Sequence, residues 1–461
     1  MARNSSMPSR TGTKSSPKIA PARLAAYQVL FRVETRHSYA AELLHSELLK
    51  DLSLADRALA TEIVLGTLRW QSKLDTQIAA ASGRPTSKLD VEVRIALRMA
   101  THQLLHLERI PAHAAVNDSV ELVKLARKRS AVPFANAVLR KLTHTSKDIE
   151  TDSSEQQRDA ASLASQYAHP QWLVERWIRN FGFENAERIC QFHQQQPVTA
   201  IRILDSATDE QLGTEKTTLE PGAIVAGARR IFSGDTTQTI LWRQHKIFIQ
   251  DEASQLVALL VGTGNRILDC CAAPGGKTSA IAGRIPNALI AACELHTHRA
   301  RKMRELIPDT RIHVVVADAE QLPFSIRFDR ILADLPCSGT GTLARNPEIK
   351  WKLRPEDISD LQVRQKKILA GALKNLEAGG RLLYSTCSLE PEEGEQVVEA
   401  ALDEHPDLQL IPMQEQLLKL KEAGEVVWPD LNSLTTDNYL RTIPGIHPCD
   451  GFFAALMGRM R

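Results

Sequence analysis

Short apolar runs alternate with helix-forming stretches along the part of the chain that follows Gln250. Such alternation is typical of strand–helix–strand units, which assemble into a parallel sheet with helices on both faces. Ligands of these sheets bind beyond the carboxyl ends of the strands. The pattern therefore predicts an α/β, Rossmann-like domain over residues 251–461. Its expected strands lie at Ile267-Leu268, Leu289 to Cys293, Val314 to Ala317, Ile331 to Ala333 and Leu382 to Tyr384.

The first half of the 461-residue chain has a different pattern. Apolar residues recur there at helical spacing, for instance at Leu24, Tyr27 and Phe31, which predicts an all-α domain over residues 19–146. Residues 1–18 are basic and rich in Ser and Pro, and we expect them to form a disordered tail.

A third region lies between these two. Residues 147–165 are polar and have almost no large apolar side chains, as expected of an exposed connection between domains. Residues 166–250 begin with a helical pattern and continue with β-type runs at 201–204, 224–226 and 247–249. They predict a small α+β domain, so the chain is expected to be multidomain.

The composition excludes several classes of protein. The chain has seven cysteines but no C-x-x-C pair, so neither a zinc site nor a disulfide framework is expected. It has no secretory signal and no apolar run long enough to span a membrane, which favours a cytoplasmic protein with no membrane or metal partner. Residues 1–150 hold 23 Lys and Arg against 14 Asp and Glu. This excess indicates a polyanionic partner about as well as it indicates an ordinary solvated surface.

Motifs whose residues could bind or react with a ligand lie at the expected strand ends. The first strand runs into a small-residue turn from Asp269 to Thr278, which would let backbone approach a ligand closely. A P-loop is excluded because Cys271 stands where its first glycine should be, and G-x-G-x-x-G is absent. Glu294 ends the second strand and could accept hydrogen bonds from a ribose. These features favour a nucleoside ligand without a pyrophosphate.

Further polar residues follow the third, fourth and fifth strands. Asp318 could accept from an adenine amino group, although a single strand-end Asp is more often a turn or helix-cap residue. Asp334 is followed by Cys337, and Cys387 ends the fifth strand, so two thiols are expected at neighbouring strand ends. A single cysteine is commonly just a small buried hydrophobe, but two thiols beside an Asp favour chemistry.

Methylation of carbon 5 of a pyrimidine needs such groups. Carbon 5 is a poor nucleophile, but a thiolate that adds to carbon 6 turns it into an enamine that can take a methyl group from a sulfonium. A carboxylic group such as Asp334 could hydrogen-bond or protonate the ring at N3. A second thiol could assist the release of the product.

Taken together, the motifs Leu268 to Lys277, Asp334 to Gly341 and Tyr384 to Ser388 resemble those of the RNA cytosine-C5 methyltransferases. The segments Arg345 to Trp351 and Asp450 to Ala454 are similar to that family too.

The remaining regions extend the resemblance to nearly the whole chain. The segments Arg23 to Leu30 and Pro133 to Arg140 resemble the antitermination-factor-like RNA-binding domain of the bacterial RsmB/Sun (Fmu) branch of the family, whose substrate is a cytosine of 16S ribosomal RNA. The middle segments His169 to Val174 and Ile249 to Ser254 also match it.

The resemblance implies a methyltransferase fold of class I, S-adenosyl-L-methionine as cofactor, and a role for each motif residue. It places Glu294 at the ribose, Asp318 at the adenine and Asp334 between cofactor and base, with Cys387 as nucleophile and Cys337 as the thiol that aids product release. The methionine part of the cofactor would be lined by Cys271, Ala272, Ala273, Pro274, Gly275, Gly276 and Lys277.

Some choices depend on the resemblance alone. DNA cytosine methyltransferases use a Pro-Cys thiol, which here is Cys337, so without the Thr386-Cys387 match the two thiols are exchangeable. Family members usually have Asp at the position of Glu294 and commonly a second Arg at the position of Ala344.

The implied partner is ribosomal RNA, most simply 16S, bound by a monomer. Two alternatives stay open: the same chemistry on 23S ribosomal RNA or transfer RNA, and a non-catalytic RNA-binding assembly factor. The retained thiols, Asp334 and the Pro274 to Lys277 turn favour an enzyme.

Overall fold

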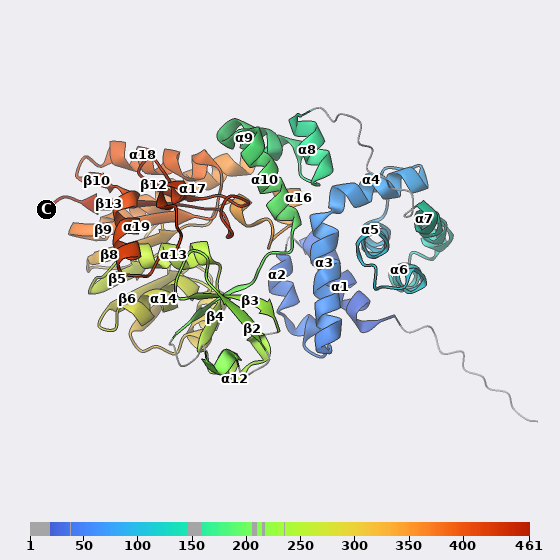
Figure 1. Cartoon of the computed structure of the whole chain (residues 1–461), viewed down its shortest axis with the longest axis horizontal. Coiled ribbons are helices and arrows are strands. Elements are labelled where there is room, and N and C mark those ends of the chain that lie inside the picture. Colours follow the sequence, from blue (N-terminus) through green and yellow to red (C-terminus); the bar gives the residue numbers. More distant parts are fainter. Residues whose placement is uncertain (1–18, 37, 146–157, 205–209, 214–216, 235) are drawn as a thin grey trace, which may run out of the picture. The chain divides into compact units, whose positions relative to one another are not determined.

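The computed structural model describes residues 19–36, 38–145, 158–204, 210–213, 217–234 and 236–461. The expected basic tail and most of the expected connection lie outside these residues. The chain divides into two compact units, residues 1–156 and 157–461 (Figure 1). Within the described residues, none of the helices has both the length and the apolar character needed to cross a bilayer.

The first unit is helical, which confirms the all-α prediction. Its core is formed mainly by Ala, Val, Leu and Ile side chains, and it also contains buried charged residues that are paired. Arg98, for example, binds both carboxylate oxygens of Asp75 at 2.7 Å. The main helices are α1 (Pro21–Arg36), α2 (Ala40–Leu44), α3 (Leu54–Arg69), α4 (Gln71–Ser82), α5 (Val91–His106), α6 (Ala112–Leu125) and α7 (Val132–Thr145).

The second unit opens with helices and a small antiparallel sheet. The strand order of this sheet is β2-β3-β1-β4. The helices at the start of this unit are amphipathic and pack around the fully buried Trp177. The helices are α8 (Ala160–Gln166), α9 (Gln171–Phe181), α10 (Phe183–Gln194) and α12 (Ile240–Arg243), and the strands are β1 (Ala200–Ile203), β2 (Thr218–Pro221), β3 (Ala228–Ser233) and β4 (Ile247–Ile249).

The prediction of a strand at residues 224–226 was wrong. This segment is a turn with a single bridge from Val225 to Val426. The carboxylate of the buried Glu252 accepts hydrogen bonds from three successive backbone N–H groups, those of Ala223, Ile224 and Val225. These bonds replace the ladder that a strand would supply, so apolar side chains are buried there without a sheet.

The large sheet carries the motifs. Its order is β11-β12-β13-β9-β8-β5-β6-β7, with β10 paired to β13. The expected strands are present and run parallel, from β9 to β7 across the sheet, whereas β13 pairs antiparallel with β9. The strands are β5 (Arg266–Asp269), β6 (Leu289–Glu294), β7 (Ile312–Val316), β8 (Phe328–Asp334), β9 (Leu376–Thr386), β10 (Leu408–Ile411), β11 (Thr435–Thr436), β12 (Tyr439–Thr442) and β13 (Phe452–Arg459).

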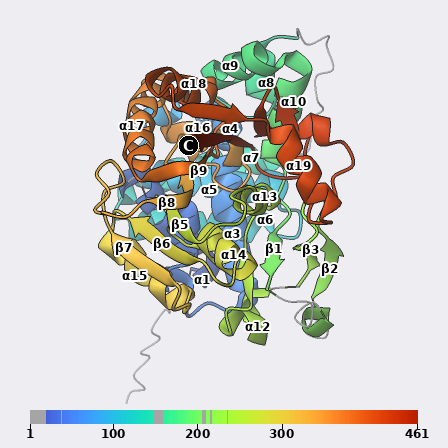
Figure 2. The ribbon, with the colours of Figure 1, turned by 90° about the vertical axis from the view of Figure 1, so that its left-hand side faces the viewer.

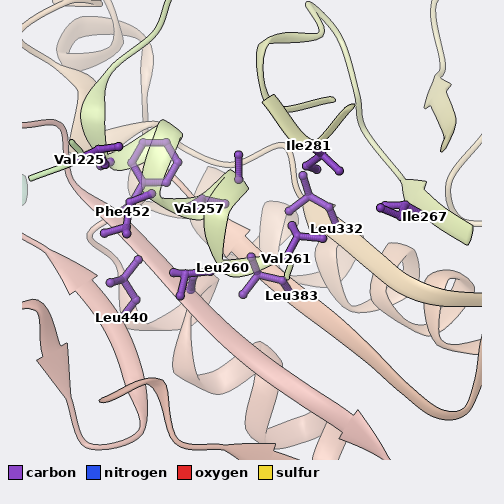
Figure 3. Packing of buried hydrophobic residues seen from close by; sticks show 14 of the residues in the cluster. Val225, Val257, Leu260, Val261, Ile267, Ile281, Leu332, Leu383, Leu440 and Phe452 are labelled. Atoms are coloured by element: carbon purple, nitrogen blue, oxygen red, sulfur yellow. The ribbon is translucent and has the colours of Figure 1, made fainter. Parts of the chain in front are cut away.

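Helices cover both faces of this sheet (Figures 1 and 2). On one face, Val257, Leu260 and Val261 pack against sheet residues such as Leu332 and Leu383, as Figure 3 shows. The other face is covered by α17 and α18. The helices of this part are α13 (Glu252–Leu260), α14 (Gly276–Arg284), α15 (Thr297–Leu306), α16 (Ile349–Lys352), α17 (Pro355–Lys374), α18 (Glu395–Glu404) and α19 (Met413–Glu422).

Candidate active site

The strand order explains why residues that are far apart in sequence meet. The parallel strands β9, β8, β5, β6 and β7 are neighbours, so their carboxyl ends form one edge of the sheet. Cys387, Asp334, Asp269 and Glu294 lie at the ends of the first four, and Asp318 follows the fifth by two residues. The sheet therefore collects the motif residues at the edge where ligands of such folds bind.

A pocket of about 280 Å³ opens at this edge. It contains Cys271, Ala273, Glu294, Asp318 and Asp334 of the residues expected to bind the cofactor. The other lining residues are Cys270, Leu295, His296, Arg299, Ala317, Ala319, Leu335, Pro336, Arg364 and Ile368.

Other residues of the first turn shape the pocket without lining it. Ala272 is a core residue whose N–H donates to the Cys293 carbonyl at 2.8 Å. Gly275 has φ +105°, and a Cβ there would lie 2.3 Å from Cδ1 of Ile307. Pro274 is exposed and Gly276 begins α14. Glycine is thus needed at 275 for the turn that leads from strand to helix.

The carboxylates that line the pocket suit S-adenosylmethionine. Glu294, Asp318 and Asp334 place three carboxylates around one cavity, which complements a sulfonium and an ammonium group. Glu294 is 5 % exposed; it accepts from the His296 N–H at 2.8 Å and lies 3.6 Å from Arg299. These contacts fix the carboxylate at the strand end, where a ribose diol could reach it.

Sequence reasoning missed two cations of this pocket, Arg299 and Arg364. Arg299 lies near the start of α15 and Arg364 lies in α17, and both line the cavity. Neither belongs to a strand-end motif. Their side chains could have been placed at the pocket only if the strand order had been known, because the helical periodicity then tells which face of each helix turns towards it.

Asp334 is held by two donors. Lys277 Nζ donates to Oδ2 at 2.7 Å and Ser385 Oγ donates to Oδ1 at 2.8 Å. Burial opposes the charge on Lys277, but the carboxylate of Asp334 and its hydrogen bond outweigh it, so the pKa of Lys277 is raised. Lys277 also lies 5.0 Å from the ring centre of Phe452. Lys277 therefore holds the Asp334 carboxylate in place, and it is not among the residues that line the pocket.

The two thiols are in contact. Sγ of Cys337 lies 3.3 Å from Sγ of Cys387, and both side chains are half-buried. The hydrogen bond with Cys387, followed by burial and by the charge of Cys387, raises the pKa of Cys337 well above its usual value. Cys337 therefore holds its proton more tightly than an ordinary thiol does.

The two remaining motif segments have structural contacts. Arg345 donates to Asp251 at 2.8 Å and to Asp450 at 2.9 Å, and the Lys350 ammonium donates to the Ala168 carbonyl at 2.9 Å. Ala344 is fully buried, so an Arg at this position would not fit without a rearrangement.

The parallel sheet, the pocket lined by three carboxylates and the adjacent thiols fit the class of S-adenosylmethionine-dependent methyltransferases. The family model described as 16S rRNA methyltransferase RsmB/F matches residues 256–458. A NusB family model matches residues 20–144, and a ferredoxin-like domain model of the RsmF/B type matches residues 169–211. The chain belongs to the RsmB/F family of ribosomal RNA methyltransferases.

Curated relatives extend this similarity over most of the chain. The probable ribosomal RNA small subunit methyltransferase B of Bacillus subtilis (strain 168) is 32 % identical over 450 residues, covering 94 % of this chain and 97 % of the relative. The ribosomal RNA small subunit methyltransferase B of Proteus mirabilis is 32 % identical over 401 residues, covering 82 % and 90 %.

Solved structures share the fold. The crystal structure of PH0851 superimposes with a TM-score of 0.79 at 22 % identity, covering 96 % of this chain and all of that one. The structure of NSun6 from Pyrococcus horikoshii with SFG gives a TM-score of 0.54 at 19 % identity, covering 63 % of this chain and 98 % of that one.

Proposed function

We propose that this chain transfers a methyl group from S-adenosylmethionine to carbon 5 of a cytosine in 16S ribosomal RNA through a covalent adduct between Cys387 and carbon 6. The observation that carries the proposal is the 3.3 Å contact between Cys337 and Cys387, next to the paired Asp334 and Lys277 at the rim of the nucleoside pocket. Covalent catalysis on a pyrimidine needs a nucleophile, a proton source and a base within one small volume.

The first step is addition. The thiolate of Cys387 forms a bond to carbon 6, and the electrons of the C5–C6 double bond move into the ring. S-adenosylmethionine, when bound, supplies a methyl group on a sulfonium, to which the activated carbon 5 is directed. Cys337 keeps its proton at this stage and donates a hydrogen bond to the Cys387 thiolate.

Asp334 acts at the ring nitrogen N3. The Lys277 ammonium and the Ser385 hydroxyl donate to its two oxygens and hold it in place, and the raised pKa of Lys277 keeps that proton on the amine. A proton from solvent, carried by Asp334 to N3, neutralises the ring as the thiolate adds, and it returns to solvent by the same route after methyl transfer.

Cys337 completes the reaction. Once Cys387 is a thioether, its charge and the hydrogen bond to its thiolate no longer hold the proton on Cys337. The pKa of Cys337 falls, and in the proposed sequence it then gives its proton to solvent. Its thiolate then takes the proton from carbon 5, the C5–C6 double bond re-forms, and the bond to Cys387 breaks. Cys337 ends protonated and Cys387 ends as a thiolate, which restores the starting pair with one proton released.

The choice of 16S ribosomal RNA rests on the family and its relatives. Both relatives described above are named small subunit methyltransferases. The NusB-type match and the excess of cations in the first 150 residues support RNA as the partner.

The test uses purified protein, unmethylated 16S ribosomal RNA and labelled S-adenosylmethionine. The unmodified chain is expected to form 5-methylcytosine, measured by mass spectrometry of nucleosides. Cys387→Ala should abolish it. Cys337→Ala should instead leave a protein–RNA adduct that survives denaturation. Cys190→Ala, which removes a buried thiol from a different apolar cluster, is the matched control and should stay active.

Other outcomes have definite meanings. Methylation by Cys387→Ala would make Cys337 the nucleophile. Methylation of 23S ribosomal RNA or transfer RNA, but not of 16S, would replace the substrate. Cofactor binding without methylation of any of these RNAs would favour an assembly factor.

A further inference from the structure

A buried carboxylate lies directly behind the two thiols. Glu393 is fully buried, and it stands six residues after Cys387 in a short helical turn (Pro391–Glu393). Its oxygen Oε1 accepts from the backbone N–H of Ser338 at 2.8 Å and from the side-chain amide of Gln365 at 2.9 Å. Such a charge is tolerated in the interior only when its oxygens are hydrogen-bonded, as they are here.

The second oxygen of this carboxylate binds two hydroxyls. Oε2 of Glu393 accepts from Ser388 Oγ at 2.6 Å and also from Ser338 Oγ. Ser338 directly follows Cys337, and Ser388 directly follows Cys387. One carboxylate therefore ties together the two loops that carry the thiols, and the two hydroxyls themselves lie 3.1 Å apart.

The backbone of Glu393 adds to this arrangement. Its carbonyl accepts from the hydroxyl of Tyr384 at 2.6 Å and from that of Thr386 at 3.3 Å. Glu393 thus contacts residues on both sides of Cys387. Together with the bonds to the carboxylate, which are stronger because their acceptor is charged, these contacts fix the loops relative to each other.

We propose that Glu393 is a positioning residue that sets the separation of the Cys337 and Cys387 sulfurs, and that it acts mainly on product release. This inference rests on the proposed function. Addition needs only Cys387 placed at carbon 6. Release needs both thiols at once, with Cys337 at the proton of carbon 5 while Cys387 is still bonded to carbon 6.

Electrostatics gives the carboxylate a second effect on the same step. The causes that raise the pKa of Cys337 are, in order, the Cys387 hydrogen bond, burial, the charge of Cys387 and the charge of Glu393. In the adduct the charge of Cys387 is gone, and Glu393 remains. Removing its charge is therefore expected to shift the pH dependence of release towards lower pH.

The experiment compares Glu393→Gln with the unmodified chain in single-turnover reactions on 16S ribosomal RNA. Adduct formation and product release are measured separately by quenching into denaturant at several pH values. Glu393→Gln should slow release by roughly tenfold to a hundredfold, as a misplacement of reacting groups does. Formation of the adduct should change much less, so the covalent complex accumulates.

The matched control is Glu392→Gln, the same chemical change one residue earlier. Glu392 is partly exposed and pairs with Arg176 instead of the thiol loops. This variant should keep the ratio of formation to release and its pH profile. A purely structural role of Glu393 would lower stability and slow both steps together, which would overturn the inference.

Two further results separate this inference from the proposed function. If Cys337→Ala traps no adduct, the covalent mechanism itself fails. If Cys337→Ala traps one while Glu393→Gln releases normally, only the role of Glu393 fails. Should Glu393→Gln not fold, Ser338→Ala decides in its place: it removes one hydroxyl from the carboxylate, and unchanged release would overturn the inference.

Discussion

Asp269, at the carboxyl end of β5, shows how burial changes the pKa of a single residue. Its carboxylate is 1 % exposed and accepts from Thr278 Oγ1 at 2.7 Å. Burial raises its pKa from 3.8 to about 6, against the lowering effect of the Thr278 hydrogen bond. The residue thus links the first strand to α14 at some cost in stability at neutral pH.

This shift makes a prediction about pH. The unfolded chain loses the proton of Asp269 near pH 3.8 and the folded chain near pH 6, so the folded state binds more protons in between. Stability from this group is fully present below pH 3.8 and falls as the pH rises to 6. The free energy of unfolding of the unmodified chain minus that of Asp269→Asn should fall by up to about 3 kcal/mol over this window. Urea unfolding at several pH values measures it, and a constant difference would contradict it.

At the residue scale, the sequence predicted that Asp334, Cys337 and Cys387 lie at neighbouring strand ends, because these residues follow apolar runs directly. The strands that precede them are neighbours in the sheet, and the two sulfurs lie 3.3 Å apart. Glu393 and Arg364 could not be predicted in the same way. Their placement depends on how a turn and a helix pack over the sheet, which no local pattern encodes.

At the scale of elements, the turn from β5 to α14 depends on one backbone conformation. Gly275 has φ +105° and faces Ile307 and Met303, so it leaves no room for a side chain. The turn fixes where α14 begins and hence where Lys277 meets Asp334.

Gly275→Ala is therefore expected to destabilise the protein by about 2 kcal/mol or more, through backbone strain and the clash with Ile307. Binding of S-adenosylmethionine should weaken as well. Denaturant unfolding and calorimetric titration would measure the two effects.

The control is Gly283→Ala in the same helix, where no atom lies within 4 Å of an added Cβ. This change should be neutral or stabilise the chain by up to about 1 kcal/mol. Equal losses for the two variants would contradict the argument.

Elements were predictable where their pattern is regular. The parallel strands and the long amphipathic helices follow from periodicity. The antiparallel strands β10 to β13 were not predicted. Strands β10, β11 and β12 have only two to four residues, and the continuous apolar run of β13 does not by itself distinguish a strand from a buried helix. The segment at 224–226 had the apolar pattern of a strand, but the carboxylate of Glu252 outcompeted sheet pairing for its N–H groups.

At the scale of the whole molecule, the chemistry and the cation excess belong to different units. All residues that line the pocket at the strand ends, and both thiols, lie in the unit of residues 157–461. The excess of Lys and Arg lies in the first 150 residues.

A chain limited to residues 157–461 should accordingly bind S-adenosylmethionine as the full chain does, but bind 16S ribosomal RNA more weakly. Its affinity for RNA should also depend less steeply on salt, because fewer phosphates are neutralised. Calorimetry and filter binding at several salt concentrations test both statements. Equal RNA affinity and equal salt slopes would contradict the assignment.

The position of β13 in the sheet has a consequence for biosynthesis. This strand, residues 452–459, pairs with β9 and so supports the strand that leads to Cys387, the proposed nucleophile. Strands β5 to β9 leave the ribosome well before it. A nascent chain therefore carries Asp334, Cys337 and Cys387 while one flank of β9 is still open, and it should acquire activity only after residues 452–459 have emerged and paired.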